Sequence, residues 1–299
     1  MPPFVEAMRP HQWVKNLLVF APLAFTEKGL LFDGPAWLAA IGAFVAFCLA
    51  ASSIYLLNDI VDREEDARHP KKRLRPIASG RLPLGLARVQ LGVQVVAVFG
   101  VAILVASPNR LPFPTWPAAY LALNLAYSFW LKRMVVIDCM CIALGFQLRV
   151  MAGAAAIGVK ASHWILLCTF FFSLFLAFCK RYEELARQSE ATGRTRATMD
   201  DYSSVFLNMT IGPLAALSIL TYALYTVSPE TMATHGTDRL MYTVPFVTYG
   251  VFRYLFLVYR KSEGGDPARL LFRDVPLMVS GLLYIGAVLM LLRLWPHAA

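Results

Sequence analysis

The sequence predicts an all-α polytopic membrane protein, and three observations lead to this fold class. First, 58% of the 299 residues are hydrophobic and only 16% are charged, and the mean hydropathy of +0.56 is too high for a soluble globular domain. Second, apolar windows close to the length that crosses a bilayer cover most of the chain. Third, the basic residues lie mainly in short loops between these windows, as membrane topology requires.

The apolar windows account for residues 1–299 as a single integral membrane domain. We expect about nine transmembrane helices in one bundle. The approximate ranges of the expected spans are 13–31, 36–58, 83–106, 114–132, 135–158, 162–180, 204–227, 240–260 and 274–295.

The distribution of Lys and Arg predicts the orientation of this bundle. If the N-terminus is cytoplasmic, the charged segments 59–81 and 180–202 fall on the cytoplasmic side with most of the basic loop residues. Cytoplasmic loops of membrane proteins carry such an excess of basic residues. We therefore expect a multi-pass protein of the cell membrane, with a cytoplasmic N-terminus and a polar cavity facing the cytoplasm. The same topology explains the net charge of +9, so nucleic-acid binding is not expected.

The charged segment from Asn58 to Arg81 contains the strongest candidate site. Asp59, Asp62 and Asp66 are spaced three and four residues apart, so their carboxylates share one face if the preceding helix continues. Carboxylate and amide oxygens suit Mg²⁺, which is typically held by one or two carboxylates plus substrate phosphates. The alternative is a solvated helix end where the acids pair with neighbouring basic residues. Because Asn58 precedes the acids and the basic loop HPKKRLRPIASG follows them, we favour a metal-diphosphate site.

Polar residues inside other spans are further candidates, since ionisable groups in spans are rare and often functional. Lys15 either faces a polar cavity or snorkels to the headgroups, and the neighbouring Asn16 favours the cavity. Asp138 is either a functional acid or a first-turn acid that favours the helix dipole or pairs with Lys132. Arg149 lies deep in the fifth span, where a structural pair and a substrate contact are both open.

The sixth span ends in a second charged motif, KRYEEL, which begins at Lys180. Spans two and six run in the same direction in this topology, so the two charged motifs can converge over one cavity. Lys180 and Glu184 share a helix face at i, i+4. The alternative is a local salt bridge on a solvated helix end.

The pattern N-D-x-x-D-x-x-x-D, followed by H-P-x-K and R-P-I-A-S-G, resembles the first signature of the UbiA-type intramembrane prenyltransferase superfamily. Ordinary members carry a second D-x-x-x-D motif after the sixth span, where this chain has KRYEEL. That departure, with RPHQWVKNLLVFAPL and YSFWLKR…D…GFQLRVMAGA, is similar to the decaprenyl-phosphate phosphoribosyltransferase branch. These motifs cover the chain from about Met8 to Tyr202. The resemblance implies a single UbiA-like domain over residues 1–299.

The resemblance further implies Mg²⁺-dependent transfer of 5-phosphoribose from phosphoribosyl pyrophosphate to a polyprenyl (decaprenyl) phosphate. Pyrophosphate leaves, and the product lies on the route to a lipid-linked arabinose donor and cell-wall arabinan. A phosphomonoester is mostly ionised near pH 7, with a second pKa of about 6, so the acceptor needs no general base. The five histidines show no catalytic clustering, which agrees with this. The implied partners are these two substrates and the membrane, and we also consider a homo-oligomer.

The resemblance divides the implied roles between the two motifs. The metal ligands would be Asp59 and Asp62 on the pyrophosphate, with Asn58 and Asp66 completing or orienting that shell. The phosphate-binding and nearby substrate-binding residues would be Lys15, Asn16, Arg73, Arg75, Tyr127 and Lys132. Acting from the opposite side would be Lys180 and Arg181 on phosphate and Glu184 on a ribose hydroxyl or second metal. The catalytic residues would then be Asp59, Asp62, Asp66 and Glu184.

Two competing functions remain at the level of sequence. The first is transfer of a prenyl group from a prenyl diphosphate to an aromatic or other acceptor, and the missing D-x-x-x-D motif opposes it. The second is a non-enzymatic transporter or lipid-binding membrane protein, which would place charged groups near the bilayer centre. Nearly all charged residues of this chain collect at one interface, so we disfavour the second.

Overall fold

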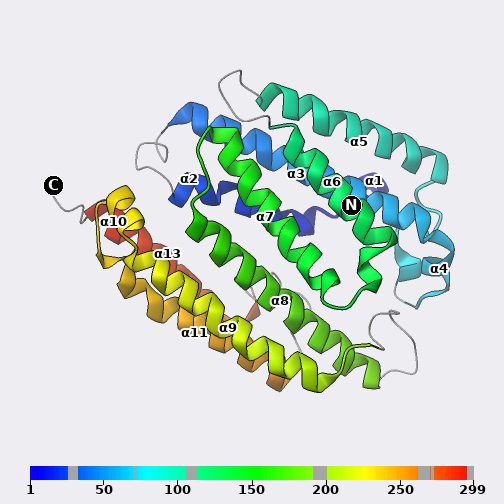
Figure 1. Cartoon of the computed structure of the whole chain (residues 1–299). Coiled ribbons are helices and arrows are strands. Elements are labelled where there is room, and N and C mark those ends of the chain that lie inside the picture. The colour runs from blue at the N-terminus through cyan, green and yellow to red at the C-terminus, as the bar shows by residue number, and fades with distance from the viewer. Residues whose placement is uncertain are drawn as a thin grey trace. The chain divides into compact units, whose positions relative to one another are not determined.

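The computed structural model describes residues 1–25, 33–70, 72–105, 113–190, 201–261, 270 and 273–294. All regular secondary structure in these residues is helical (Figure 1). The chain divides into two compact units. The first unit comprises residues 1–25, 29–129 and 148–161, and the second comprises residues 26–28, 130–147 and 162–299.

The first unit is built around one long helix, α3 (Gly34–Val61), which packs against α5 (Leu84–Val105). Asp33 caps the start of α3 by accepting a hydrogen bond from the Ala36 amide. The remaining elements of the unit are α1 (Pro3–Met8), η1 (Pro10–Phe20), α2 (Ala21–Phe25), α4 (Arg63–Arg68), η3 (Lys72–Leu74) and α6 (Thr115–Phe129). Of these, α1, η1 and α6 also contact α3, so nearly every neighbour in the unit is positioned by this helix.

Small residues let these helices approach closely. The buried face of α3 is rich in alanine, and a Cβ added at Gly42 would collide with the side chain of Val105 on α5. The second half of α7 (Ile137–Ile157) belongs to the first unit, where a Cβ added at Gly153 would overlap the backbone carbonyl of Val19 on η1. Gly153 is therefore required where η1 crosses α7.

The second unit consists mainly of long helices packed in pairs. In this unit α8 (His163–Glu190) packs against α9 (Ser204–Val227), and α11 (Val244–Lys261) packs against α13 (Val275–Leu294). The shorter elements are η4 (Leu131–Arg133), α10 (Pro229–His235) and η6 (Arg239–Thr243). The first half of α7 joins this unit, and its Cys139 shares a buried core with Phe175, Leu207 and Leu257.

The helices confirm an all-α membrane protein. Seven helices among the described residues are long and apolar enough to cross a bilayer. On α5, large aliphatic side chains such as those of Val89, Val96 and Leu104 are exposed, as lipid-facing residues are. The expected span 13–31 begins instead as a 3₁₀ helix followed by α2, and residues 26–31 lie outside the described residues. The helix α6 has 15 residues, so the count of nine spans stays a prediction.

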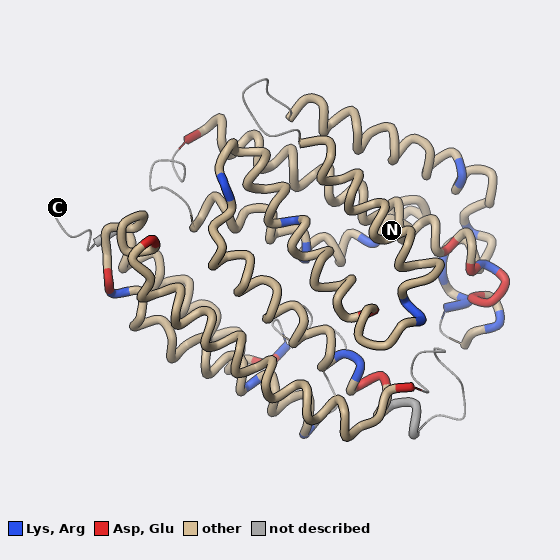
Figure 2. Tube along the Cα trace, viewed as in Figure 1, with Lys and Arg blue, Asp and Glu red and all other residues tan. Residues whose placement is uncertain are grey.

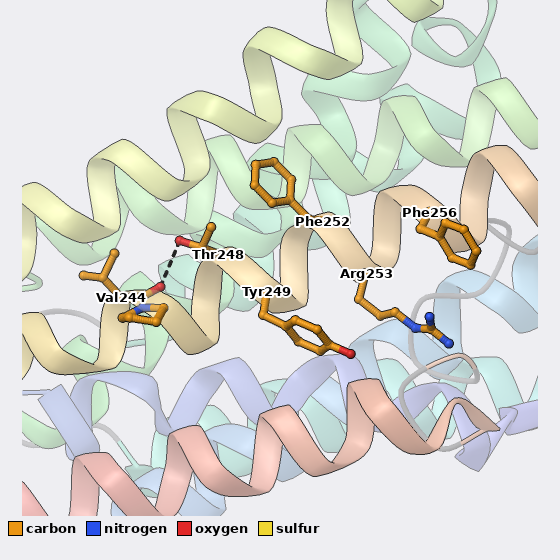
Figure 3. A pocket seen from close by; sticks show the side chains of 7 residues that line it. Val244, Thr248, Tyr249, Phe252, Arg253 and Phe256 are labelled. Carbon is orange, nitrogen blue, oxygen red and sulfur yellow. Dashed lines mark hydrogen bonds between the residues drawn. The ribbon is translucent and has the colours of Figure 1, made fainter.

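A shallow hollow of about 610 Å³ lies along one face of α11 (Figure 3). Tyr249, Phe252 and Phe256 line it and are exposed, as is typical of aromatic side chains in contact with lipid. The one charged lining residue, Arg253, donates two hydrogen bonds to the Asp274 carboxylate, at 3.0 and 2.8 Å. The hollow thus has the character of a lipid-facing surface whose arginine is neutralised.

We expect Gly153→Ala to destabilise the protein, because the new methyl group overlaps the Val19 carbonyl and the helices must move apart. Overpacking of this kind costs roughly 1–3 kcal/mol. Gly100→Ala on α5 is the matched control, since a Cβ at Gly100 meets nothing within 4 Å. Thermal unfolding in detergent should show a lower Tm for Gly153→Ala alone, and equal Tm values for both variants would contradict the close approach.

Candidate functional site

The first charged motif forms a cluster at the C-terminal end of α3. The side chains of Asp59 and Asp66 are only 2% and 1% exposed. The helix does not continue unbroken through the acids, because α3 ends at Val61 and α4 begins at Arg63. Asp62 lies at this junction and is half-buried, as is Asn58. Figure 2 shows acidic and basic residues gathered around α4 and the loop that follows it.

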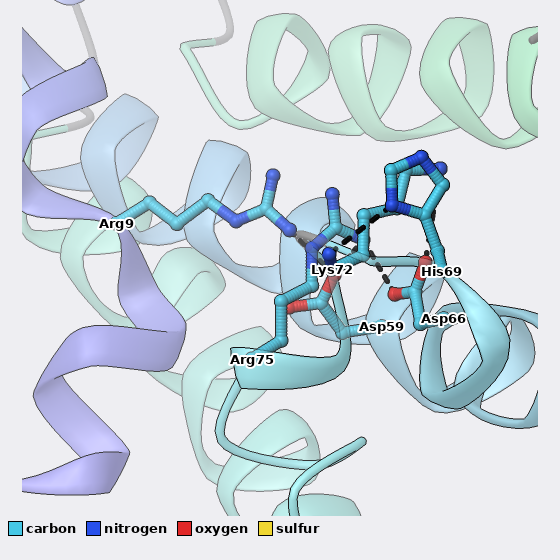
Figure 4. A network of polar contacts seen from close by, with 6 residues as sticks. All are labelled: Arg9, Asp59, Asp66, His69, Lys72 and Arg75. Atoms are coloured by element: carbon cyan, nitrogen blue, oxygen red, sulfur yellow. Dashed lines mark hydrogen bonds and ion pairs between the residues drawn. The ribbon is translucent and has the colours of Figure 1, made fainter.

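Three cations from two segments neutralise the two buried carboxylates (Figure 4). One guanidinium nitrogen of Arg75 lies 2.5 Å from Asp66 Oδ2 and 3.1 Å from Asp59 Oδ1, so it bridges both acids. The Arg9 guanidinium also donates to Asp59 Oδ1. Lys72 Nζ lies 3.7 Å from Asp66 Oδ1. The expected pairing of acids with neighbouring basic residues therefore occurs, but in a buried cluster rather than on a solvated helix end.

Arg9 is not among the residues that the sequence predicts for this site. Its backbone is left-handed, with φ 52° and ψ 60°, a conformation that non-glycine residues adopt only under local constraint. It lies between α1 and η1, with its guanidinium 4.9 Å from the centre of the Tyr55 ring. The only local signal is the run Arg9-Pro10 before an aromatic residue, which suits an ordinary interfacial entry equally well.

The segment around Arg9 is held in place by contacts on both sides. Ser52 on α3 donates to the Met8 carbonyl at 2.8 Å and accepts from the Trp13 indole at 3.1 Å. Arg81 forms two hydrogen bonds to the Glu6 carboxylate, at 2.7 and 2.9 Å. These hydrogen bonds hold the pKa of Glu6 below its usual value. The N-terminus is thus fastened to α3 and to the loop after η3 independently of Arg9.

The two buried carboxylates fit a divalent cation by their chemistry. The position between Asp59 and Asp66 already holds positive charge, because the Arg75 guanidinium bridges them. Mg²⁺ is typically held by one or two carboxylates together with waters and substrate phosphates. Among the described residues, no group of three or more His, Cys, Asp or Glu side chains could hold a metal ion alone. A divalent ion here therefore needs oxygen ligands from water, a substrate or an amide such as Asn58.

A second polar network crosses the interior of the first unit. Asn16 is completely buried, and its amide oxygen accepts a hydrogen bond of 2.7 Å from Arg149 Nε. Arg149 also donates to the Tyr120 hydroxyl at 3.0 Å and lies over that ring. The Asn16 amide donates to Cys48 Sγ at 3.3 Å. Asn16 and Arg149 thus belong to an internal network of the bundle, whereas Lys15 beside them is half-buried.

The second unit has its own charged cluster, centred on a buried ion pair. Arg181 Nε lies 2.7 Å from Asp138 Oδ2, and both side chains are at most 1% exposed. Arg181 also pairs with Glu184, whereas Lys180 lies 3.9 Å from the same carboxylate. Pairing with Lys132 was one of the alternatives for Asp138, and the structure pairs this acid with Arg181 instead. No local sequence pattern links Arg181 to Asp138, and only the fold brings the two side chains together.

Tyr202 links this cluster to the loop before α7 by two hydrogen bonds. Its hydroxyl donates to Asp138 Oδ1 at 2.7 Å and accepts from the Val136 amide at 2.8 Å. Burial raises the pKa of Tyr202, so the phenol keeps its proton and remains a donor. Val136 has a φ of 68°, which is a strained value for a β-branched residue. The Tyr202 contacts therefore hold a strained turn that also carries Lys132.

The remaining predicted residues are more accessible. Arg73 is exposed on η3, whereas Tyr127 on α6 and Lys132 on η4 are half-buried. Lys180 and Glu184 have side-chain exposures of 42% and 32%, so both can be reached from solvent. Their convergence with the first motif over one cytoplasm-facing cavity remains a prediction.

These features define a class of protein: a polytopic helical membrane protein with buried carboxylates and several cations at the ends of its spans. A model of the UbiA prenyltransferase family matches residues 18–275. The chain therefore belongs to the UbiA prenyltransferase family.

Two curated relatives share most of their length with this chain. A decaprenyl-phosphate phosphoribosyltransferase of Corynebacterium glutamicum is 34% identical over 98% of this chain and 87% of its own. A protein of the same name from Mycolicibacterium smegmatis is 35% identical over 95% of this chain and 90% of its own. Among solved structures, a UbiA homologue from Archaeoglobus fulgidus bound to GPP and Mg²⁺ matches with a TM-score of 0.70 at 16% identity, covering 97% of this chain and 99% of that one. That likeness supports the helical fold.

We expect Tyr202→Phe to lower stability, because the Val136 amide loses its acceptor and the Asp138 carboxylate loses a donor. Leaving buried polar groups without partners costs roughly 1–3 kcal/mol each. Tyr249→Phe, which removes an exposed hydroxyl on α11, is the control. Thermal unfolding in detergent should separate the two variants. If Tyr202→Phe has the same Tm as the wild type, the Tyr202 hydroxyl does not stabilise the turn.

Proposed function

We propose that this protein transfers 5-phosphoribose from phosphoribosyl pyrophosphate to a polyprenyl phosphate, such as decaprenyl phosphate, and releases pyrophosphate. The observation that carries the proposal is the similarity, over nearly the whole chain, to proteins named for this activity. The carboxylate and cation cluster of the first unit supplies groups suited to a diphosphate. We further propose that the product serves a lipid-linked arabinose donor and cell-wall arabinan.

The acceptor in this reaction needs little activation. Its phosphate is mostly ionised near pH 7, so an oxygen can attack the ribose C1 without a general base. The new C1–O bond forms as the bond from C1 to the pyrophosphate oxygen breaks, and an in-line displacement inverts C1. Catalysis must then come from stabilising the leaving pyrophosphate and from holding two anions together.

We assign the leaving group to the first charged motif. Asp59 and Asp66 would hold Mg²⁺, with Asn58 and Asp62 completing or orienting the shell. This exchanges the roles that we expected for Asp62 and Asp66, because Asp66 is the acid buried beside Asp59. The ion would neutralise charge on the departing pyrophosphate. Arg75 lies on both carboxylates and Arg73 is exposed beside it, so both cations can bind phosphate oxygens. Lys15 and Tyr127 remain candidates for substrate contact in the same unit.

We assign contacts with the other reacting groups to the second charged motif. Lys180 and Lys132 are accessible cations suited to a phosphate, and Glu184 is an accessible acid suited to a ribose hydroxyl or second metal. Arg181 is buried against Asp138, so we revise its role from substrate binding to positioning. Asn16 likewise acts by orienting Arg149 rather than by touching phosphate. We also propose a cytoplasmic N-terminus and site, by the distribution of basic residues.

Prenyl transfer is the second candidate function. The Archaeoglobus fulgidus homologue is described as bound to GPP and Mg²⁺. A 4-hydroxybenzoate polyprenyltransferase of Saccharomyces cerevisiae is also 25% identical over 89% of this chain. The KRYEEL motif departs from D-x-x-x-D, and the more similar relatives favour phosphoribosyl transfer.

The decisive assay supplies purified protein with Mg²⁺, phosphoribosyl pyrophosphate and polyprenyl phosphates of several lengths. We expect lipid-linked phosphoribose by mass spectrometry and its loss with EDTA, because the acidic cluster needs a divalent ion to hold pyrophosphate. No product here, with consumption of geranyl diphosphate and an aromatic acceptor, would assign the chain to prenyl transfer instead.

Asp59→Asn should reduce phosphoribosyl transfer by roughly 100-fold or more, because the amide replaces a charged metal ligand. The side chain keeps its size, so the protein should still fold. Glu64→Gln removes the same charge from an exposed position on α4 and should keep near wild-type activity. Initial rates at saturating Mg²⁺ measure the difference, and comparable rates for the two variants would remove Asp59 from the metal site.

A further inference from the structure

The Arg9 guanidinium contacts a carboxylate oxygen of Asp59 that a second guanidinium also contacts. Both Arg9 and Arg75 donate to Oδ1 of Asp59, whose side chain is 2% exposed. Arg75 also reaches Asp66, so a single guanidinium contacts both acids. Two guanidinium groups on one oxygen repel each other. Of the two, Arg9 is the residue that lies outside the first charged motif.

The charges of this cluster do not balance. Arg9, Lys72 and Arg75 contribute three positive charges, whereas Asp59 and Asp66 contribute two negative charges. A cluster with surplus positive charge is suited to bind a polyanion. The surplus grows further when a divalent ion takes the carboxylates, and each displaced guanidinium then needs another anion as a partner.

The Arg9 ion pair is not needed to fasten the N-terminal segment. Hydrogen bonds from Ser52 to Met8 and from Trp13 to Ser52 fix the chain on both sides of Arg9. Arg81 holds Glu6 in addition. Arg9 nevertheless has a left-handed backbone conformation, and its guanidinium points toward the acids. Backbone strain of this kind is concentrated at functional positions.

We propose that Arg9 is a further diphosphate-binding residue of this site, which leaves Asp59 for a diphosphate when a divalent ion binds to the carboxylate. The inference rests on the proposed function, because it takes a diphosphate as the substrate class. The Arg9 side chain is 23% exposed, so its guanidinium can reach solvent. The divalent ion displaces Arg9 from Asp59, and the diphosphate gives Arg9 a new anionic partner. Because both effects are needed, the divalent ion and the diphosphate bind cooperatively.

Mn²⁺ binding to the full chain in detergent, measured with and without pyrophosphate, tests this exchange without turnover. In the wild type, pyrophosphate should tighten Mn²⁺ binding by at least about fivefold, the lower end of typical coupling. Arg9→Gln should bind Mn²⁺ alone more tightly, because the carboxylate loses a competing cation. It should bind pyrophosphate more weakly in the presence of Mn²⁺, so the coupling between the two ligands falls.

Arg88→Gln is the charge-matched control, because Arg88 is exposed on α5 of the same unit. It should keep wild-type coupling, and Arg9→Lys should recover part of the pyrophosphate affinity. An unchanged coupling in Arg9→Gln, with a wild-type Tm, would overturn the role of Arg9 and leave the proposed function standing. A wild type that binds no pyrophosphate with Mn²⁺ would instead overturn the proposed function and this inference together.

Discussion

Two buried carboxylates impose the main constraint on the first unit. Asp59 and Asp66 lie where water cannot solvate them, and a bare anion in such a place is strongly unfavourable. The chain meets this constraint by bringing Arg9 from before η1 and Lys72 and Arg75 from the loop after α4. The same cations are the groups that a phosphate ester would need.

The fold was largely predictable because its signals are local. Span-length apolar windows correctly indicated most of the helices, since each must satisfy its backbone hydrogen bonds within the bilayer. The 3₁₀ conformation of η1 could not be predicted, because no residue pattern separates it from an α-helix over so short a stretch. The break at Asp62 is a second local failure, as the i, i+3 and i, i+4 spacing of the acids suggested an unbroken helix.

The site was predictable in its acids and less so in their partners. The spacing of Asp59 and Asp66 was sufficient to indicate a cluster, and adjacent basic residues supplied Arg75 as a candidate. The pairing of Arg9 with Asp59 spans 50 positions in sequence, and that of Arg149 with Asn16 spans 133. Such pairings depend on how helices pack, which periodicity does not encode. Tertiary packing also buries Arg181, which was expected to bind phosphate.

The 3₁₀ geometry of η1 fixes the distance between the two ends of this segment. At about 2.0 Å per residue its 11 residues span roughly 22 Å, about 5 Å more than the same residues would span as an α-helix. Arg9 precedes this segment and Val19 lies near its end, against Gly153. With about three residues per turn, inserting or deleting one residue would rotate one end by about 120° relative to the other. The length of the chain between these two anchors is thus as constrained as the identity of the residues themselves.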